Sequence, residues 1–358
     1  NLNNQYPVQD WEVRYPKKDA VSNYTRIVNS LQAKITGGKE RKPVKYATNK
    51  MNVSQSLNIL GATAEEAIEK ELQQLFVEKK AFTPVFMSSL NDDQRKKIIR
   101  SQMFLKAKYD ANGKFQKIKA RLVANGKQQD RTLYPDTNSP TVSLSSLFMV
   151  LNMTAYYGWN AACIDIGGAY LNAEMKGESV LMELNSQISG IVSKMQLVND
   201  KYKYGGGKLL VKLDKALYGC VQSAKLWYET LSTALVDMGF VKNDVDKCVM
   251  YKGDGVNQIV ILIYVDDMLI VGKNSEILGE IIEKLKAKFG EVTSDMSNDF
   301  SYLGMRIQLM KNKVRISMDG YTDELLSEYG FYHSSGRLSP AKPDIFRKVG
   351  SVVRFESI

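Results

Sequence analysis

The sequence predicts an α+β fold in which helices pack on one face of a mostly antiparallel sheet. Strand-like and helix-like segments follow one another without a regular βαβ alternation, and this order argues against a doubly wound parallel sheet. Two hairpin signals favour antiparallel pairing: Asn112-Gly113 lies between two strand-like runs, and two apolar arms, Ile259–Ile263 and Met268–Val271, flank a short segment with two aspartates. At 358 residues the chain is long enough for two or three subdomains.

The N-terminal part of the chain is polar up to about residue 60. It is expected to form a weakly ordered arm with some helix around residues 18–34. A helix is then predicted over residues 63–80, where Thr63 and Glu66 form a capping box at its start. Five apolar residues at helical spacing predict its buried face: Ala64, Ile68, Leu72, Leu75 and Phe76.

A basic hairpin is predicted next, over residues 100–131, with its turn at Asn112-Gly113. Residues 91–131 contain twelve Lys or Arg against four Asp or Glu, and this excess is close to the net charge of +10 of the whole chain. Two interpretations of the basic surface stay open. It could contact phosphate groups, or it could be a charged edge strand that resists aggregation.

The remaining elements alternate irregularly to the end of the chain. Helices are predicted over residues 139–158, 221–240, 275–290 and 321–330. Strands are predicted over residues 160–166, 179–184, 208–214, 248–251, 259–271, 300–310 and 313–318. The helix at 275–290 is expected to face a sheet with five apolar residues: Ile277, Ile281, Ile282, Leu285 and Phe289.

The ionisable residues narrow the possible chemistry. The chain has one histidine, His333, so histidine-based metal ligation and Ser-His-Asp catalysis are nearly excluded. Three widely spaced cysteines form neither a disulfide framework nor a zinc site, and they fit a reducing compartment. Catalysis would therefore rest on carboxylates, which favour hard cations such as Mg²⁺. The pI near 9.2 is compatible with a polyanionic partner, and no run reaches the roughly 18 apolar residues of a transmembrane helix.

Asp266 and Asp267 interrupt the apolar run 258–272, where two adjacent charges are costly. They could simply form a turn, since aspartate is a favoured turn residue. However, the run is apolar on both strand faces, which predicts a central hairpin, and adjacent carboxylates repel one another unless they share a cation. Asp165 ends a second apolar strand and is followed by Gly167-Gly168, which would let the backbone approach a ligand. Together these strands predict a carboxylate cluster suited to two Mg²⁺ ions and phosphoryl transfer.

Six ordered blocks of this sequence resemble the reverse transcriptase of copia-type LTR retrotransposons. The resemblance covers roughly residues 60–345, and its blocks are KARLVANGKQQ (119–129), SPTVS (139–143), DIGGAYLNAEM (165–175), LDKALYGCVQSAKLWY (213–228), ILIYVDDMLIVG (261–272) and YLGMRI (302–307). The sequence departs from the family in two places: Phe82 stands where a tryptophan is usual, and glycines occupy 167–168, where many relatives have a bulkier residue.

The resemblance implies a right-hand polymerase fold with a mostly antiparallel palm sheet. It divides the chain into an N-terminal arm (1–60), fingers (61–158 with part of 172–220), a palm with the aspartates (159–308) and a thumb-like segment with the C-terminal tail (309–358). It implies a polymerase that adds dNTPs to a primer 3′-hydroxyl on RNA or DNA templates. The alternatives are a catalytically silent nucleic-acid-binding protein, or a Mg²⁺-dependent nuclease or integrase with a carboxylate triad.

The resemblance also implies roles for individual residues. Asp165 and Asp266 would be the principal ligands of two Mg²⁺ ions, with Mn²⁺ as a substitute, and Asp267 and the carbonyl of Ile166 would support them. The incoming nucleotide would be contacted by six residues: Lys119, Arg121, Gly168, Ala169, Tyr170 and Gln222. Tyr170 matches the steric gate that rejects a ribose 2′-hydroxyl. The hairpin that grips the primer would be Leu303-Gly304-Met305.

The implied partners are an RNA template, a DNA primer, their hybrid and dNTPs, with no membrane. The chain begins with Asn1 rather than Met, and it is expected to be a piece of a polyprotein with an upstream integrase and a downstream ribonuclease H. The expected location is the cytoplasm, within virus-like particles, with the nucleus as an alternative.

Overall fold

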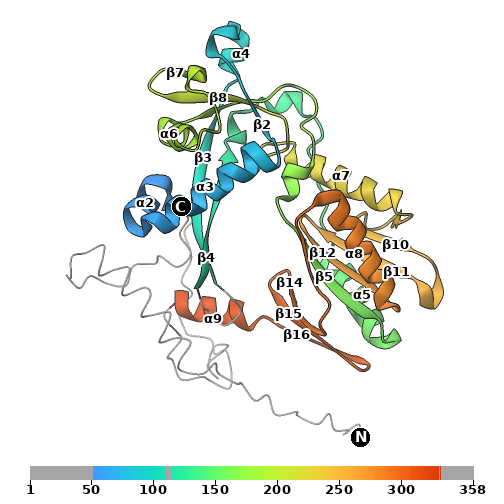
Figure 1. Ribbon diagram of the computed structural model, residues 1–358. Coiled ribbons are helices and arrows are strands. Elements are labelled where there is room, and N and C mark those ends of the chain that lie inside the picture. Colours follow the sequence, from blue (N-terminus) through green and yellow to red (C-terminus); the bar gives the residue numbers. More distant parts are fainter. Residues whose placement is uncertain (1–50, 110–114, 330, 332–358) are drawn as a thin grey trace, which may run out of the picture.

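The computed structural model describes residues 51–109, 115–329 and 331 (Figure 1). Its α-helices are α2 (Val53–Leu60), α3 (Ala62–Gln73), α4 (Asp92–Lys96), α5 (Leu144–Tyr157), α6 (Ser186–Lys194), α7 (Ser223–Asp237), α8 (Ser275–Phe289) and α9 (Asp319–Glu328). Its first strands are β1 (Met51–Asn52), β2 (Phe82–Pro84), β3 (Ile99–Tyr109), β4 (Phe115–Ala124), β5 (Asn160–Ile166), β6 (Leu181–Leu184), β7 (Lys203–Tyr204) and β8 (Lys208–Leu213). The later strands are β9 (Val241–Lys242), β10 (Val249–Lys252), β11 (Ile259–Tyr264), β12 (Asp267–Gly272), β13 (Val292–Asp295), β14 (Asp299–Tyr302), β15 (Met305–Met310) and β16 (Lys313–Ser317).

The described strands form three sheets, and nearly all of their pairs are antiparallel. A seven-stranded sheet has the order β1-β3-β6-β8-β2, with β4 beside β3 and β7 beside β8. A six-stranded sheet has the order β13-β5-β12-β11-β10-β9, and β14-β15-β16 form the third sheet. The pair β3–β6 is parallel. Helices are added to antiparallel sheets without βαβ alternation, so the predicted α+β class is confirmed.

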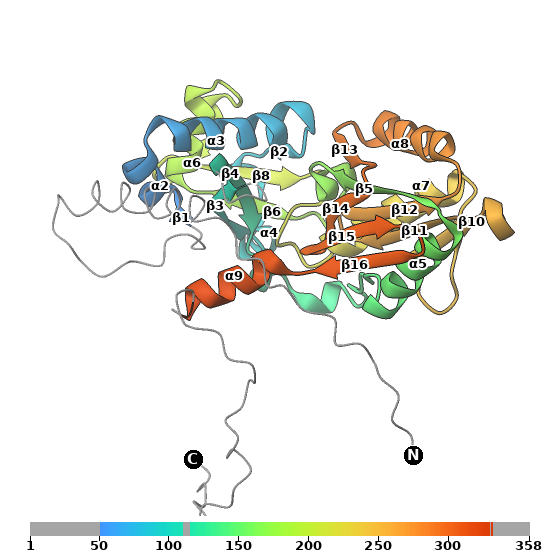
Figure 2. The ribbon, with the colours of Figure 1, turned by 90° about the horizontal axis from the view of Figure 1, so that it is seen from below.

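The seven-stranded sheet and its helices form one half of the molecule, on the left in Figure 2. β3 and β4 form the predicted basic hairpin, and β4 alternates between buried and exposed residues, with Ile118, Ala120 and Leu122 facing the core. Helix α3 packs against β4 with the predicted apolar stripe: Ala64, Ile68, Leu72 and Leu75 are fully buried, and Phe76 is partly buried. Phe82 is also in this core and meets Phe76 edge to face.

The predicted capping box at Thr63 and Glu66 is wrong. α3 begins one residue earlier, at Ala62, and its N-cap is Gly61, which has no side chain to accept a hydrogen bond. Gly61 also ends α2, so the two helices share a glycine with positive φ (+52°) and Thr63 lies inside the helix. At its other end α3 continues as a π-helix over Gln74–Glu78, and this wider turn carries the chain towards the second half of the molecule.

The six-stranded sheet forms the core of the second half. Figure 2 shows α8 on one side of this sheet and the β14–β16 sheet on the other. α7 and α8 meet through Trp227 and Phe289, whose ring centroids are 5.3 Å apart. Of the stripe predicted for α8, Ile277 is exposed, and Leu278 occupies the buried position instead. The helix is thus rotated slightly from the predicted orientation.

Several predicted boundaries change in the structure. The strand predicted over 300–310 is the hairpin β14–β15, with its turn at Leu303-Gly304, and the polar segment after β6 contains α6. β13 was not predicted and completes the sheet beside β5. The helix predicted around 18–34, the turn at Asn112-Gly113 and His333 lie outside the described residues. Among the described helices, none is long and apolar enough to cross a membrane.

Candidate active site

The three predicted aspartates meet at one end of the six-stranded sheet. β5 and β12 are antiparallel neighbours, and their register places Asp165 directly opposite Asp267. Residues that face one another across such a pair project from the same side of the sheet. Asp266 precedes Asp267 in the adjoining turn, and the amide of Ile166 donates a hydrogen bond to the carbonyl of Asp266 (3.3 Å). Carboxylates about a hundred positions apart in the sequence therefore lie near one another at this end of the sheet, and we call Asp165, Asp266 and Asp267 the carboxylate group.

The turn of the YVDD hairpin is tighter than the sequence predicted. Tyr264 pairs with Asp267, so the loop consists of Val265 and Asp266 alone, and Asp267 already belongs to β12. Val265 has φ +58°, a left-handed conformation that is strained for a β-branched residue. The indole N–H of Trp227 donates a hydrogen bond to the carbonyl of Val265 (2.6 Å). A side chain from α7 thus holds the backbone of the strained turn.

The three aspartates repel one another electrostatically. Burial, and then the neighbouring Asp266 and Asp165, raise the pKa of Asp267 to about 6. Burial, and then Asp266, also raise the pKa of Asp165, whereas Lys119 and Arg121 lower it. Ionising Asp165 and Asp267 beside Asp266 is therefore unfavourable until positive charge approaches them.

The basic strand β4 supplies positive charge to this site. Lys119 and Arg121 are both exposed, and they alternate with the buried residues of β4. Their positive charges lower the pKa of Asp165, so β4 acts on the carboxylates electrostatically. Lys119 lies opposite Lys106 of β3, which adds to the positive charge of the hairpin.

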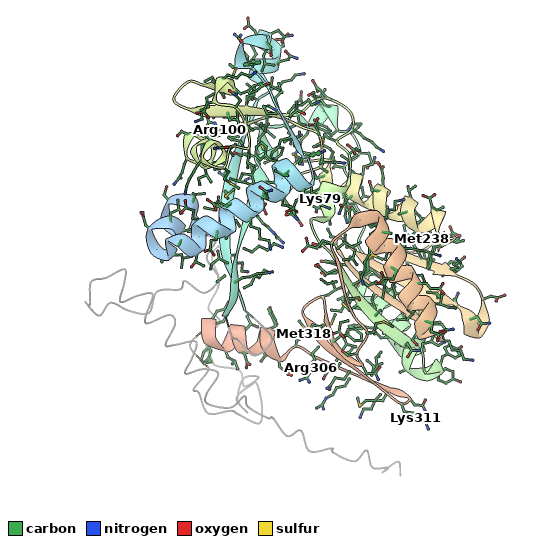
Figure 3. The ribbon with its side chains drawn as sticks, in the orientation of Figure 1. Lys79, Arg100, Met238, Arg306, Lys311 and Met318 are labelled. Atoms are coloured by element: carbon green, nitrogen blue, oxygen red, sulfur yellow. The ribbon has the colours of Figure 1, made fainter. Side chains whose placement is uncertain are left out.

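The loop after β5 has structural reasons for its two glycines. A Cβ atom at Gly167 would lie 2.6 Å from the Glu291 carboxylate, and Gly168 has φ +58°. The ammonium group of Lys79, which follows the π-helix, donates to the side chain of Asn172 (2.7 Å) and to the carbonyl of Phe289 (3.2 Å). Lys79 therefore lies at the junction of the two halves, as its label in Figure 3 shows.

The other predicted nucleotide contacts differ in their exposure. Gly168 and Tyr170 are partly exposed, whereas Ala169 is fully buried within a 3-10 turn. Gln222 is also buried: its side chain accepts a hydrogen bond from Gln129 (3.1 Å) and its amide group donates to the sulfur of Met175 (3.1 Å). In this conformation the accessible groups of the predicted set are thus on β4 and at Gly168 and Tyr170.

The predicted primer hairpin lies on the same side of the sheet as the aspartates. Leu303 and Gly304 form the turn between β14 and β15 and have φ +51° and +78°. Met305 is buried at the start of β15. The thiol of Cys163, two residues before Asp165 on the same strand face, donates to the carbonyl of Ser301 on β14 (3.4 Å).

The donor chemistry of the site fits a hard divalent cation, because carboxylates that raise one another's pKa gain from a shared positive ion. Ile166, the predicted carbonyl ligand, is buried and pairs with Val292. Within the part of the chain that the structure describes, no three His, Cys, Asp or Glu side chains are already grouped to hold a metal. The side chains of the aspartates would therefore have to rotate towards one another around a bound ion.

A family comparison agrees with this geometry. The family model described as "Reverse transcriptase (RNA-dependent DNA polymerase)" matches residues 86–343, which include β4, β5 and the β11–β12 hairpin. The chain belongs to the reverse transcriptase family. The predicted resemblance to copia-type elements is confirmed by relatives of this reverse transcriptase domain among retrotransposon polyproteins.

Three of these relatives show how much of each protein is shared. The Pol polyprotein of transposon RE1 from Arabidopsis thaliana is 27% identical over 69% of this chain and 16% of its own length. The polyprotein of transposon TNT 1-94 from Nicotiana tabacum is 27% identical over 68% of this chain and 18% of its own. The Ty1-DR4 Gag-Pol polyprotein of Saccharomyces cerevisiae is 28% identical over 78% of this chain and 16% of its own length. The chain therefore spans less than a fifth of the length of these relatives.

A solved structure of telomerase from Candida albicans, in complex with a fragment of telomeric RNA, also aligns with this chain. The alignment covers 70% of this chain and 51% of the telomerase chain, at 9% identity and a TM-score of 0.34.

Four residues of the site were missed by sequence reasoning. Trp227 and Tyr218 lie within the predicted block 213–228, but their neighbours in space are far away in the sequence. Lys79 acts through the loop after β5. Glu71 is partly buried on α3, and its carboxylate accepts a hydrogen bond from the amide of Leu122 on the outer edge of β4 (2.9 Å). No local pattern marks any of these positions.

Proposed function

We propose that this chain is an RNA-directed DNA polymerase that adds dNTPs to a primer 3′-hydroxyl on RNA or DNA templates. The observation that supports this most directly is the pairing of Asp165 with Asp267, with Asp266 in the adjoining turn, opposite a basic strand. Carboxylates on a rigid central hairpin can keep a fixed geometry during phosphoryl transfer, and the basic strand complements a triphosphate.

The carboxylates would hold two Mg²⁺ ions, with Asp165 and Asp266 as the main ligands and Asp267 and the Ile166 carbonyl in support. Mn²⁺ could replace Mg²⁺, since both prefer oxygen ligands. When bound, the ions would lower the pKa of the primer 3′-hydroxyl and neutralise charge on the leaving pyrophosphate. The raised pKa of Asp267 fits a supporting role, because its negative charge is unfavourable until a positive charge is present.

The chain's own residues would orient the nucleotide and the primer. Arg121 can offer a bidentate fork to a phosphate, and Lys119 a point charge. Tyr170 is partly exposed beside the carboxylate group and would exclude a ribose 2′-hydroxyl by its bulk. The turn at Leu303-Gly304 would support the primer end. Gly168 is accessible, whereas Ala169 and Gln222 would need a change of local conformation to contribute, because both are buried.

In the parent polyprotein, we propose an upstream integrase and a downstream ribonuclease H, with action in cytoplasmic virus-like particles. The printed names of the relatives, Pol and Gag-Pol polyproteins, support the polyprotein context.

Primer extension on an RNA template with dNTPs and Mg²⁺ tests the proposal. Wild-type protein should extend the primer, Asp266→Asn should not, and Asp254→Asn, which removes an exposed charge in the loop before β11, should retain activity. If the wild type and Asp266→Asn give equal extension, or if neither extends any primer while both bind the template, the catalytic proposal is wrong. The second result would favour a silent nucleic-acid-binding protein.

A further inference from the structure

Tyr218 occupies the space between two residues with different predicted roles. It lies in the loop between β8 and α7 and is half-buried. The guanidinium carbon of Arg121 lies 5.0 Å from the centroid of the Tyr218 ring, within the range of a cation–π contact. The ring centroids of Tyr218 and Tyr170 are 4.5 Å apart, with an angle of 46° between the rings. One aromatic ring therefore contacts both Arg121, the residue predicted to bind the triphosphate, and Tyr170, the residue predicted to contact the sugar.

The backbone of Tyr218 is fixed to the strand that carries Arg121. The amide of Ala124 donates a hydrogen bond to the carbonyl of Tyr218 (2.8 Å). The chains cross so closely that a Cβ atom at Gly219 would lie 2.0 Å from the carbonyl oxygen of Ala124, and one at Gly126 would lie 2.0 Å from that of Gly219. Gly219 also has φ +93°. This crossing holds the loop in register with β4, so the backbone that carries the ring of Tyr218 is fixed relative to the strand that carries Arg121.

The surroundings of Tyr218 keep its hydroxyl group protonated. Burial, and then the charge of Asp266, raise the pKa of the Tyr218 hydroxyl to about 12, although Arg121 lowers it. Burial and Asp266 also raise the pKa of Tyr170. Both phenols are therefore neutral at physiological pH, and they lie in the field of the carboxylate group. A general acid or base role for Tyr218 is unnecessary to explain this arrangement.

We propose that Tyr218 is a positioning residue that fixes the spacing between Arg121 and Tyr170, and so couples triphosphate binding to the choice of sugar. The proposal rests on the proposed polymerase function. A dNTP whose triphosphate contacts Arg121 and whose sugar contacts Tyr170 requires both side chains to hold their places together. Without the ring of Tyr218, Arg121 loses its cation–π partner and Tyr170 loses its stacking partner. Both contacts are then expected to loosen at once.

The test compares Tyr218→Leu, which removes the ring, with Tyr218→Phe, which keeps it. Steady-state primer extension gives KM and kcat for a dNTP and for the matching rNTP. For Tyr218→Leu we expect the KM for the dNTP to rise about tenfold, given the usual strength of aromatic and cation–π contacts, with a smaller change in kcat. The preference for dNTP over rNTP should fall by at least about threefold. Tyr218→Phe should stay close to wild type in both quantities.

The chain offers a matched control at Tyr202. Its ring stacks on Phe86 (centroids 4.3 Å apart) and lies 5.5 Å from the ammonium group of Lys201, so it has the same kinds of partner outside the site. Tyr202→Leu should leave KM and sugar preference unchanged. If Tyr218→Leu does not fold, Tyr218→Met provides a second side chain without a ring. A double variant with Tyr170→Ala should show a loss of sugar preference that is no greater than that of Tyr170→Ala alone.

Several outcomes would overturn the proposal. An active Tyr218→Leu or Tyr218→Met variant with wild-type KM and sugar preference would remove Tyr218 from the site. A raised KM with unchanged sugar preference would show that the two contacts are not coupled. A Tyr218→Phe variant as impaired as Tyr218→Leu would assign the effect to the hydroxyl rather than the ring. These results differ from failure of the proposed function, in which the wild-type protein itself extends no primer.

Discussion

The hydrogen bond from Trp227 to the strained YVDD turn gives the sharpest prediction about the hairpin. Trp227→Phe keeps an aromatic ring in the core but removes the donor that contacts the carbonyl of Val265 at 2.6 Å. The stability lost in Trp227→Phe therefore has two sources, the smaller ring and the missing hydrogen bond. Trp159→Phe is a matched control, because Trp159 is equally buried in the same core and its indole N–H has no hydrogen-bond partner among the described residues. The two substitutions remove the same atoms, and only one removes a hydrogen bond.

The difference between the two variants can be estimated from the contacts. A typical hydrogen bond contributes about 1 kcal/mol net, and an abandoned buried acceptor costs about 1–3 kcal/mol. Val265 is half-buried, so water can partly replace the lost donor. We therefore expect Trp227→Phe to reduce the free energy of unfolding by about 1–2 kcal/mol more than Trp159→Phe does. Urea denaturation with both variants and the wild type measures this difference directly.

Activity should separate the variants further. Asp266 follows Val265 in the two-residue turn, so movement of that turn displaces a predicted metal ligand. A misplacement of about 1 Å can reduce a reaction rate about a hundredfold. At a temperature where both variants are folded, we expect kcat for primer extension to fall at least about tenfold for Trp227→Phe and little for Trp159→Phe. Equal unfolding free energies together with equal kcat values would refute the assigned role of Trp227.

Two further predictions concern stability. Asp299 has a pKa lowered to about 2, chiefly by its hydrogen bonds to Arg306, so its contribution is present above the ordinary value of 3.8 and is lost as pH falls through about 2. Asp299→Asn should therefore destabilise the protein at pH 7 but not in strong acid. An equal difference in unfolding free energy between wild type and variant at both pH values would contradict this. Gly219→Ala should cost several times more stability than Gly177→Ala, because both have positive φ but a Cβ at Gly177 meets nothing within 4 Å; similar unfolding midpoints would show that the crossing at Gly219 relaxes easily.

Elements with strict periodicity could be predicted from the sequence. The stripe of α3, the alternation of β4 and the apolar arms of the β11–β12 hairpin are each repeated over several turns or residues, so the signal survives small errors in position. α6 and β13 could not be predicted in this way. The segment SQISGIVSK is only nine residues long, with three apolar residues among small and polar ones, so its periodicity is weak. VTSD has a single apolar residue, and β13 exists because β5 provides an edge with which to pair. Tertiary contact determines such elements more than their own composition does.

In the candidate site, too, some residues could be predicted from the local sequence and others only from tertiary contacts. Asp165, Asp266 and Asp267 could be found because carboxylates are conspicuous in apolar strands. Tyr218 and Trp227 look like ordinary aromatic core residues in the sequence, and their roles depend on partners nearly a hundred and about forty positions away. The sequence also suggested that Gly167-Gly168 frees space for a ligand, whereas Glu291 fills the space beside Gly167. A local pattern can identify reactive groups, but the residues that hold them are defined by the folded chain.

The strained turn at Val265 explains why the hairpin needs apolar flanks. A left-handed β-branched residue costs about 1–3 kcal/mol. The two strands offset this cost with side chains that are completely buried: Ile261, Leu262, Met268, Leu269 and Ile270. Each contributes about 1.5–3 kcal/mol through burial, so the pairing of β11 with β12 exceeds the strain several times over. The turn is consequently held in one conformation, and Asp266 projects from a backbone that cannot relax. The hydrophobic residues on both sides of Asp266 and Asp267 thus hold these two charged residues in place, although their position in an apolar run is energetically unfavourable.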